Sequence, residues 1–340
     1  MRRWFVTICA VLSVVANASA GSMRKNPGRA EQSTASDANS KAQTRARRAA
    51  MASVDSWAIQ LRYLNRSALA GAPVDMIVID HAPHPAKAVE IPYTREEIAP
   101  LKIRSDGRRR IVLAYLSVGE AERYRYYWRT EWDVSQTRPK WLGAENPQWP
   151  GDYQVQFADP EWQALIFGTK ESYLDRILQA GFDGVYLDRV DAFQDVEDTM
   201  PGAEGAMSGF VQRLADHARR TNPSFLIVMQ NAEELAASKS LLSRLDGLSK
   251  EDLIFGFDNS DLPNPEPMLR DSVANLRKAK RAGVKVFALE YAATPEHVAE
   301  AIALTRREGF LLHITERTLG TLSVDAVASP SNSPAITPAR

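Results

Sequence analysis

Five short apolar runs of this sequence each lead directly, or within a few residues, to an acidic side chain. Runs of this length, bounded by glycine or polar residues, are typical of buried strands. A protein core has no use for so many carboxylates, because they repel one another and are costly to desolvate. Two kinds of chemistry fit such a set: oxygen ligation of a divalent cation, or acid–base and nucleophilic work on a sugar. The acidic residues are Asp80, Glu120, Asp188, Glu233 or Glu234, and Glu290.

The clearest of these patterns lies between Gly181 and Asp191. An amphipathic stretch, 161–180, precedes it and predicts helix, and Gly181 stands where a helix favours a left-handed cap. The run 185–187 then predicts a buried strand that ends on Asp188, with Asp191 three residues further. The simpler interpretation is that Asp188 caps the following helix or pairs with Arg189.

Eight predicted strands alternate with helical or loop segments, which favours a parallel sheet with right-handed crossovers. We therefore expect an α/β protein with a single (β/α)8 TIM-type barrel domain, and a doubly wound open sheet is the second choice. In a barrel the carboxyl ends of the strands converge on one face, so the acidic residues would line one bowl. The strands are expected at 57–61, 74–79, 111–118, 185–187, 225–229, 245–248, 284–289 and 310–314, and helices at 95–101, 207–219, 267–281 and 295–307.

Aromatic residues gather in one region, with five tryptophans between positions 128 and 162 and several tyrosines among them. The part at 138–153 is rich in Pro, Gly, Asn and Asp and predicts a loop on the side of the strand ends. Aromatic faces in such a loop, Tyr124 and Trp149 among them, favour stacking on sugar rings. Trp162, on the helical stretch, is expected in the core.

The two ends of the chain differ from its middle in composition. Residues 1–20 have the pattern of a secretory signal peptide: Arg2 and Arg3, an apolar run, then Ala18-Ser19-Ala20. We expect cleavage after Ala20 and a secreted or periplasmic protein. Residues 21–51 and 323–340 are poor in large apolar residues and are expected to be a disordered linker and tail, which leaves 52–322 for the folded domain.

The formal charge of zero gives no reason to expect nucleic acid or a membrane surface as a partner. The one cysteine, Cys9, lies in the signal peptide, so disulfides and thiol chemistry are excluded from the mature chain. The pair His81 and His84 is a weak metal pattern that fits an exposed loop better. We expect a monomer that needs no metal or cofactor.

Several stretches resemble glycoside hydrolase family 114, the endo-α-1,4-polygalactosaminidase family. The resemblance spans the region from the first predicted strand to the last. It implies a (β/α)8 barrel that hydrolyses an α-1,4-linked galactosamine-containing polymer. It also implies that a strand-four aspartate and a strand-five glutamate form the catalytic pair. The stretches are 57–61, 114–120 with Glu122, Tyr124 and Arg125, 146–151, 181–191 and 230–235.

By this resemblance the catalytic aspartate is Asp188 and the catalytic glutamate is Glu234. A shift of the alignment by one residue would place the glutamate at Glu233 instead. Ile59 and Ala232 depart from the family pattern, where tyrosine and glycine are usual. On this hypothesis Asp188 attacks the anomeric carbon with retention, and Glu234 protonates the leaving oxygen and later activates water. The alternatives are a non-catalytic carbohydrate-binding barrel and a metal-dependent hydrolase. Substrate binding is expected from Asp80, Glu120, Tyr124, Trp149, Tyr186, Asp191, Asn231, Glu233 and Glu290.

Overall fold

A computed structural model describes residues 27–83, 90–292 and 294–323. The expected signal peptide, His84 and nearly all of the expected tail lie outside these residues. Contacts between Cα atoms divide the chain into two units, 1–41 and 42–340. Among the residues described, no helix combines the length and the apolar character needed to cross a bilayer.

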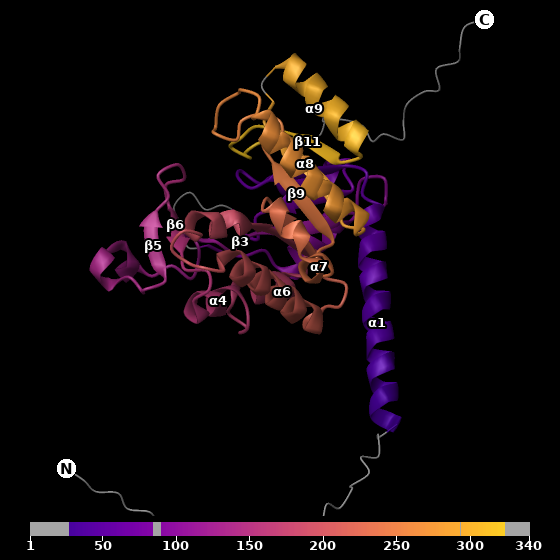
Figure 1. Ribbon diagram of the computed structural model, residues 1–340, viewed down its shortest axis with the longest axis vertical. Coiled ribbons are helices and arrows are strands. Elements are labelled where there is room, and N and C mark those ends of the chain that lie inside the picture. Colours follow the sequence, from indigo (N-terminus) through magenta and orange to yellow (C-terminus); the bar gives the residue numbers. More distant parts are fainter. Residues whose placement is uncertain (1–26, 84–89, 293, 324–340) are drawn as a thin grey trace, which may run out of the picture. The chain divides into compact units, whose positions relative to one another are not determined.

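Eight parallel strands form one sheet that curls into a nearly closed barrel, as the sequence predicts (Figure 1). The first and last strands meet where the indole Nε1 of Trp57 donates to the carbonyl of Leu311 at 3.0 Å. Each expected strand is present, so the (β/α)8 fold is confirmed. In sheet order the strands are β1 (Trp57–Gln60), β2 (Met76–Ile79), β3 (Ile111–Ser117), β7 (Gly184–Asp188), β8 (Leu226–Gln230), β9 (Gly247–Glu251), β10 (Lys285–Glu290) and β11 (Leu311–Ile314).

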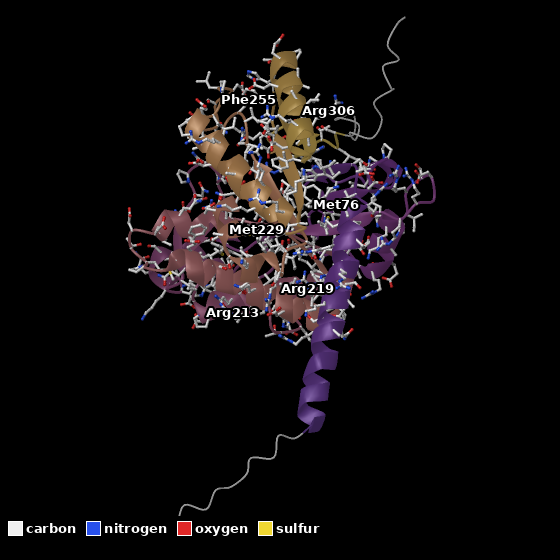
Figure 2. All side chains as sticks on the ribbon, turned by 45° about the vertical axis from the view of Figure 1, so that its right-hand side comes forward. Met76, Arg213, Arg219, Met229, Phe255 and Arg306 are labelled. Carbon is white, nitrogen blue, oxygen red and sulfur yellow. The ribbon has the colours of Figure 1, made fainter. Side chains whose placement is uncertain are left out.

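The strands are buried on both faces, and the side chains of each strand alternate between two cores. In β2, Met76 and Val78 fill the barrel interior, whereas Ile77 and Ile79 pack under the surrounding helices. Figure 2 shows Arg213 and Arg306 on the outer helices, where both are exposed. This alternation decides which residues at a strand end can face the mouth of the barrel.

Helices follow most of the strands and cover the barrel. The expected helical stretch at 161–180 is two helices, because Gly168 takes a φ of +118° between them and the hydroxyl of Ser172 donates to the carbonyl of Ala164 at 2.7 Å. The helices and 3-10 turns are α2 (Arg66–Gly71), α3 (Arg95–Ile98), η1 (Ala99–Lys102), α4 (Pro160–Ile166), α5 (Tyr173–Ala180), η4 (Val190–Val196), α6 (Ala203–Thr221), η5 (Glu233–Ala237), α7 (Lys239–Leu242), α8 (Glu266–Arg281) and α9 (Pro295–Glu308).

The aromatic region after β3 carries its own small antiparallel sheet, in the order β4-β6-β5, where the sequence predicts only a loop. Its strands are β4 (Glu120–Glu122), β5 (Leu142–Glu145) and β6 (Asp152–Val155), with the 3-10 turns η2 (Thr130–Asp133) and η3 (Ser135–Thr137) between β4 and β5. Tryptophan side chains pack beneath it in a row, with ring centroids 5.2–5.5 Å apart from Trp128 through Trp132 and Trp141 to Trp162. Most of these rings therefore hold the small sheet to the barrel, and Trp162 is buried as expected.

Helix α1 (Pro27–Ala52) covers most of the stretch 21–51, for which the sequence predicts a disordered linker. Its last turns belong to the same unit as the barrel. Arg47 forms an ion pair with Asp246 at 3.3 Å and donates to the carbonyl of Pro223 at 2.9 Å, and Met51 is buried. The composition hides this contact, because arginine stems supply packing area that a search for large apolar residues does not detect.

Candidate active site

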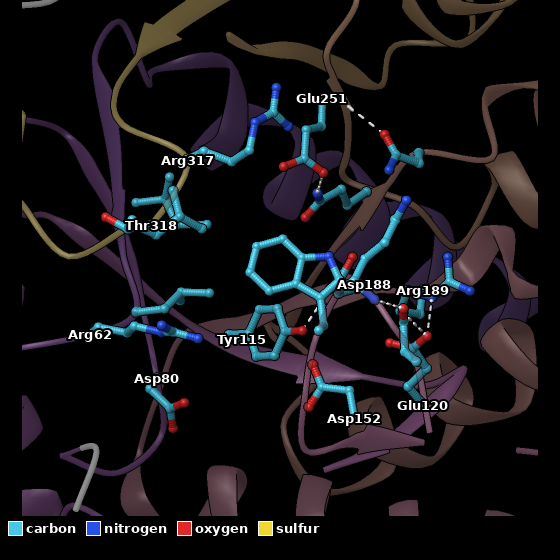
Figure 3. A pocket seen from close by; sticks show the side chains of 18 of the residues that line it. Arg62, Asp80, Tyr115, Glu120, Asp152, Asp188, Arg189, Glu251, Arg317 and Thr318 are labelled. Carbon is cyan, nitrogen blue, oxygen red and sulfur yellow. Dashed lines mark hydrogen bonds and ion pairs between the residues drawn. The ribbon is translucent and has the colours of Figure 1, made fainter. Parts of the chain in front are cut away.

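A cavity of about 230 Å³ lies at the carboxyl ends of the barrel strands, between them and the small sheet (Figure 3). Aromatic and amide side chains, Tyr124 and Trp149 among them, share its wall with the charged groups. Carboxylates outnumber guanidinium groups in this wall by six to three, so the field inside favours a cation or a hydrogen-bond donor. The charged groups are Asp80, Glu120, Asp152, Asp188, Asp191, Glu251, Arg62, Arg189 and Arg317.

Asp188 ends β7 and lies on the inward side of the strand, two residues beyond Tyr186 in the barrel interior. The hydroxyl of Tyr115, from the neighbouring strand β3, donates to its Oδ2 at 2.6 Å. Burial, followed by the charge of Glu251, raises the pKa of Asp188 to about 7, although the Tyr115 hydrogen bond acts in the opposite direction. The carboxyl is therefore poised to exchange a proton near neutral pH.

Glu251 ends β9 on the inward side, and sequence analysis did not identify it. The amide of Gln230 donates to its Oε2 at 2.5 Å and the hydroxyl of Tyr291 donates to its Oε1. Burial raises the pKa of Glu251, and the Tyr291 hydrogen bond lowers it. The predicted sixth strand stopped at Leu248; extending it through Ser249 and Lys250 would have ended on this glutamate, as the other strands end on acids.

The structure does not place Glu234 in the cavity of Asp188. Asn231 and Ala232 have φ values of +56° and +52°, which turn the chain after β8 away from the barrel mouth. Glu234 then accepts from the amide of Gln194 in a second cavity of about 280 Å³. That cavity shares Asp191 and Asn231 with the first. The expected pairing of Asp188 with Glu234 is therefore not found, and Glu251 lies beside Asp188 instead.

Glu233 also lines the second cavity rather than the first. Its Oε1 accepts from the hydroxyl of Ser272, and its Oε2 lies 3.8 Å from the ammonium of Lys250. These contacts join η5 to α8 and β9. The expected role of Glu233 in binding the same sugar as Asp188 does not fit this position.

Two further residues expected to bind substrate are buried away from the cavity. Glu290 is fully buried because it ends β10 on the outward side, next to Ala288 of the outer core. Its Oε1 accepts from the amides of Leu253 and Ile254, both at 3.0 Å. Tyr186 does point inward, but one layer below the mouth, where its hydroxyl donates to Ser249 at 2.8 Å. Both residues support the site without reaching it.

Arg189, with a left-handed φ of +55°, organises one side of the cavity. Its guanidinium lies 3.1 Å from Glu120 and 3.2 Å from Asp191. Asn146 from the small sheet donates to Glu120 at 2.9 Å, and Asn231 donates to Asp191 at 3.5 Å. Burial raises the pKa of both carboxyls, and the Arg189 charge opposes the rise. These acids have partners and face the cavity, and their expected role in binding substrate stays a prediction.

Asp80 lines the cavity but forms an ion pair with the buried Arg125. Arg125 lies 2.8 Å from Asp80, 2.9 Å from Glu90 and 2.6 Å from Glu122. Burial raises the pKa of Asp80, but the Arg125 charge and the His81 contact outweigh it and hold the pKa well below its usual range. Asp80, His81 and Glu90 are close enough to hold a metal ion, but the guanidinium of Arg125 already occupies their acceptor atoms.

Trp149 and Tyr124 line the cavity from the small sheet and the segment after β4. Trp149 is 41 % exposed, unlike the buried Trp132, Trp141 and Trp162. An aromatic face open to solvent beside a cavity is suited to stacking on a sugar ring. This position agrees with the expected binding role, which stays a prediction.

The sequence model of glycoside-hydrolase family GH114 matches residues 14–330 of this chain. An uncharacterised protein of Deinococcus radiodurans is 34 % identical over 276 residues, which cover 80 % of this chain and 84 % of the relative. An uncharacterised protein of Methanocaldococcus jannaschii is 36 % identical over 244 residues, or 69 % of this chain and 66 % of the relative.

Among solved structures, the glycoside hydrolase domain of PelA from Pseudomonas aeruginosa superposes with a TM-score of 0.57 at 20 % identity. The match covers 79 % of this chain and 97 % of that domain. At this identity the likeness is one of fold, and it agrees with the barrel described above.

Proposed function

The chain belongs to glycoside-hydrolase family GH114, and from this premise we propose that it is an exported, endo-acting enzyme that hydrolyses α-1,4-linked galactosamine-containing polysaccharide. The observation that carries the proposal is the pair of Asp188 and Glu251, which share one cavity, where the charge of Glu251 helps to raise the pKa of Asp188. The excess of carboxylates in the cavity supports a substrate that carries ammonium groups.

In the proposed reaction the two carboxyls share one proton. Asp188 in its ionised form attacks the anomeric carbon, and Glu251 gives its proton to the leaving glycosidic oxygen, which forms a covalent glycosyl-enzyme. Glu251, now ionised, takes a proton from water as the water attacks the anomeric carbon. Asp188 then leaves, and the sugar is released with its original anomeric configuration. Tyr115 stabilises the carboxylate of Asp188 through its hydroxyl.

Substitutions can test whether Glu251 or Glu234 is the catalytic partner of Asp188. We expect Asp188→Asn and Glu251→Gln each to lower kcat about a hundredfold or more, because each removes one half of the acid–base chemistry. Glu234→Gln is the matched control and should keep its activity, since its carboxylate lies in the second cavity. The measurement is release of reducing ends from a galactosamine polymer, with the products sized for endo action and the first anomer identified by NMR.

A loss in Glu234→Gln with full activity in Glu251→Gln would reinstate the pair predicted from the sequence. Binding of the polymer without turnover by the wild type would support a carbohydrate-binding barrel instead. Export is checked separately: the protein recovered outside the cytoplasm should begin at Gly21.

A further inference from the structure

Asp152 lines the catalytic cavity from the small sheet, and the reaction described above does not use it. It begins β6 and lies directly opposite Glu122 in the antiparallel pairing with β4. Side chains opposite one another in such a pair share a face of the sheet, and Glu120, two residues before Glu122, shares that face as well. Three carboxylates therefore share one face of the small sheet, and two of them, Glu120 and Asp152, line the cavity of Asp188.

Asp152 differs from the neighbouring carboxylates because its side chain has no partner among the described residues. Glu122 accepts from Arg125 at 2.6 and 2.9 Å, and Glu120 accepts from Asn146 at 2.9 Å. Figure 3 draws the contacts of Asp188 and Glu120 as dashed lines, and none reaches Asp152. Its Oδ1 is buried without a hydrogen bond.

This arrangement is unfavourable for the empty protein. Ionising Asp152 would place two like charges directly opposite each other, which weakens a strand pair, and a buried acceptor without a donor is costly. Burial, then the charges of Glu122 and Glu120, raise the pKa of Asp152 to about 8, against the opposing effect of Arg125. Such a conflict between local interactions and the fold is typical of a functional position.

We propose that Asp152 binds the 2-ammonium group of a de-N-acetylated hexosamine unit and so selects the amino sugar over its N-acetylated form. The inference rests on the proposed function, since it names what the same cavity recognises. Glu120 and Glu122 already pair with arginines, whereas an ammonium would bring to Asp152 a positive charge and donors for its carboxylate oxygens. A sugar hydroxyl would satisfy one acceptor but would not offset the cost of ionising Asp152 opposite Glu122. An N-acetyl group would bring a neutral amide and a methyl group to a charged wall.

Asp152→Asn tests the selection, because it removes the charge while keeping the shape and the strand pair. On a de-N-acetylated galactosamine polymer we expect kcat/KM to fall roughly tenfold or more, the usual cost of losing a charge-assisted hydrogen bond. On the N-acetylated polymer the change should stay within about twofold, since a neutral group does not use the charge. Glu145→Gln is the matched control: Glu145 lies in β5 of the same sheet, outside the cavity lining, and should alter neither value.

A direct binding measurement keeps the inference independent of turnover. Near pH 7 Asp152 holds a proton in the empty cavity and must release it to pair with an ammonium. Galactosamine titrated into the wild type in buffers of different ionisation heats should therefore release up to about one proton per site. Asp152→Asn should release none, and N-acetylgalactosamine should release none with either protein.

The outcomes separate the inference from the proposed function. Equal losses of Asp152→Asn on both polymers, or unchanged proton release on binding, would overturn the role of Asp152 even in an active enzyme. If the wild type cleaves neither polymer, the proposed function fails, but proton release that depends on Asp152 would still establish the ammonium site.

Discussion

Two tyrosine hydroxyls control the ionisation of the paired carboxyls. Tyr115 donates to Asp188 and Tyr291 donates to Glu251, and each contact lowers a pKa that burial has raised. Removing both protons leaves two buried negative charges close together, and adding both leaves no nucleophile. The active form carries one proton, so kcat/KM should follow a bell-shaped pH profile, and the limb set by Asp188 should lie near its pKa of about 7.

Tyr115→Phe should move the limb set by Asp188 to higher pH. The hydroxyl stabilises the ionised carboxylate, so its loss raises the pKa of Asp188, and we expect a shift of about one pH unit together with a lower maximum. The measurement is kcat/KM from pH 4 to 10. Tyr126→Phe is the control, because that hydroxyl donates to the carbonyl of Glu171 outside the catalytic cavity. A profile in which neither limb moves would show that Tyr115 does not set the ionisation of Asp188.

The backbone segments that follow β3 and β7 pack closely against each other at Gly119. The amide of Val118 donates to the carbonyl of Asp188 at 3.0 Å. A Cβ added to Gly119 would lie 2.2 Å from the carbonyl oxygen of Arg189 and 2.5 Å from the Cβ of Ala192. Backbone therefore packs on backbone at the position that carries Asp188, and only glycine allows this approach.

Gly119→Ala should lower both stability and activity. The added methyl group must push the Arg189 backbone away, and overpacking of this kind lowers the free energy of unfolding by about 1–3 kcal/mol. Urea denaturation gives this value, and kcat should fall in the folded variant because Asp188 moves with its neighbour. Gly205→Ala in α6 is the control with the opposite sign: no atom lies within 4 Å of the added Cβ, and alanine should stabilise the helix by about 0.5–1 kcal/mol. Equal effects of the two substitutions would contradict the packing argument.

Over the whole molecule, buried carboxyls make stability depend on pH. Burial raises the pKa of Glu290 to about 8, and that of Asp152 and Asp188 to about 8 and 7. Each holds a proton in the folded state that the unfolded chain releases above about pH 4. The folded state binds more protons, so stability falls as pH rises toward 8. His313 opposes this only in acid, because burial lowers its pKa to about 4.

Glu290→Gln should remove part of this pH dependence. A glutamine carbonyl can still accept from the amides of Leu253 and Ile254, but no charge has to be buried at high pH. We expect the variant to gain at least about 1 kcal/mol over the wild type at pH 9 and little at pH 5. The free energy of unfolding at both pH values measures this, with Glu145→Gln as the exposed control. A gain of equal size at both pH values would show that burial of the charge is not the cause.

The barrel fold and many of the residues at its mouth can be predicted from the sequence. Apolar runs locate the eight strands because each strand is buried on both faces, and Asp188 follows from the strand that it ends. The small sheet β4-β6-β5 could not be predicted in this way, since its strands are short and polar and are held by tryptophans that lie outside the strands themselves. Glu251 was missed because β9, with Ser249 and Lys250, offers only one large apolar side chain.

The sequence by itself determined the order of strands and helices, the supply of acids at the strand ends and the family resemblance. Only the tertiary structure decided which acids meet. In β10, Phe287 and Leu289 face the barrel interior while Val286 and Ala288 face the helices, and both sets are apolar. Such a strand does not reveal which side is inward, so Glu290 and Glu251 look alike in the sequence. Closure of the barrel turns Glu251 toward Asp188 and Glu290 away from it.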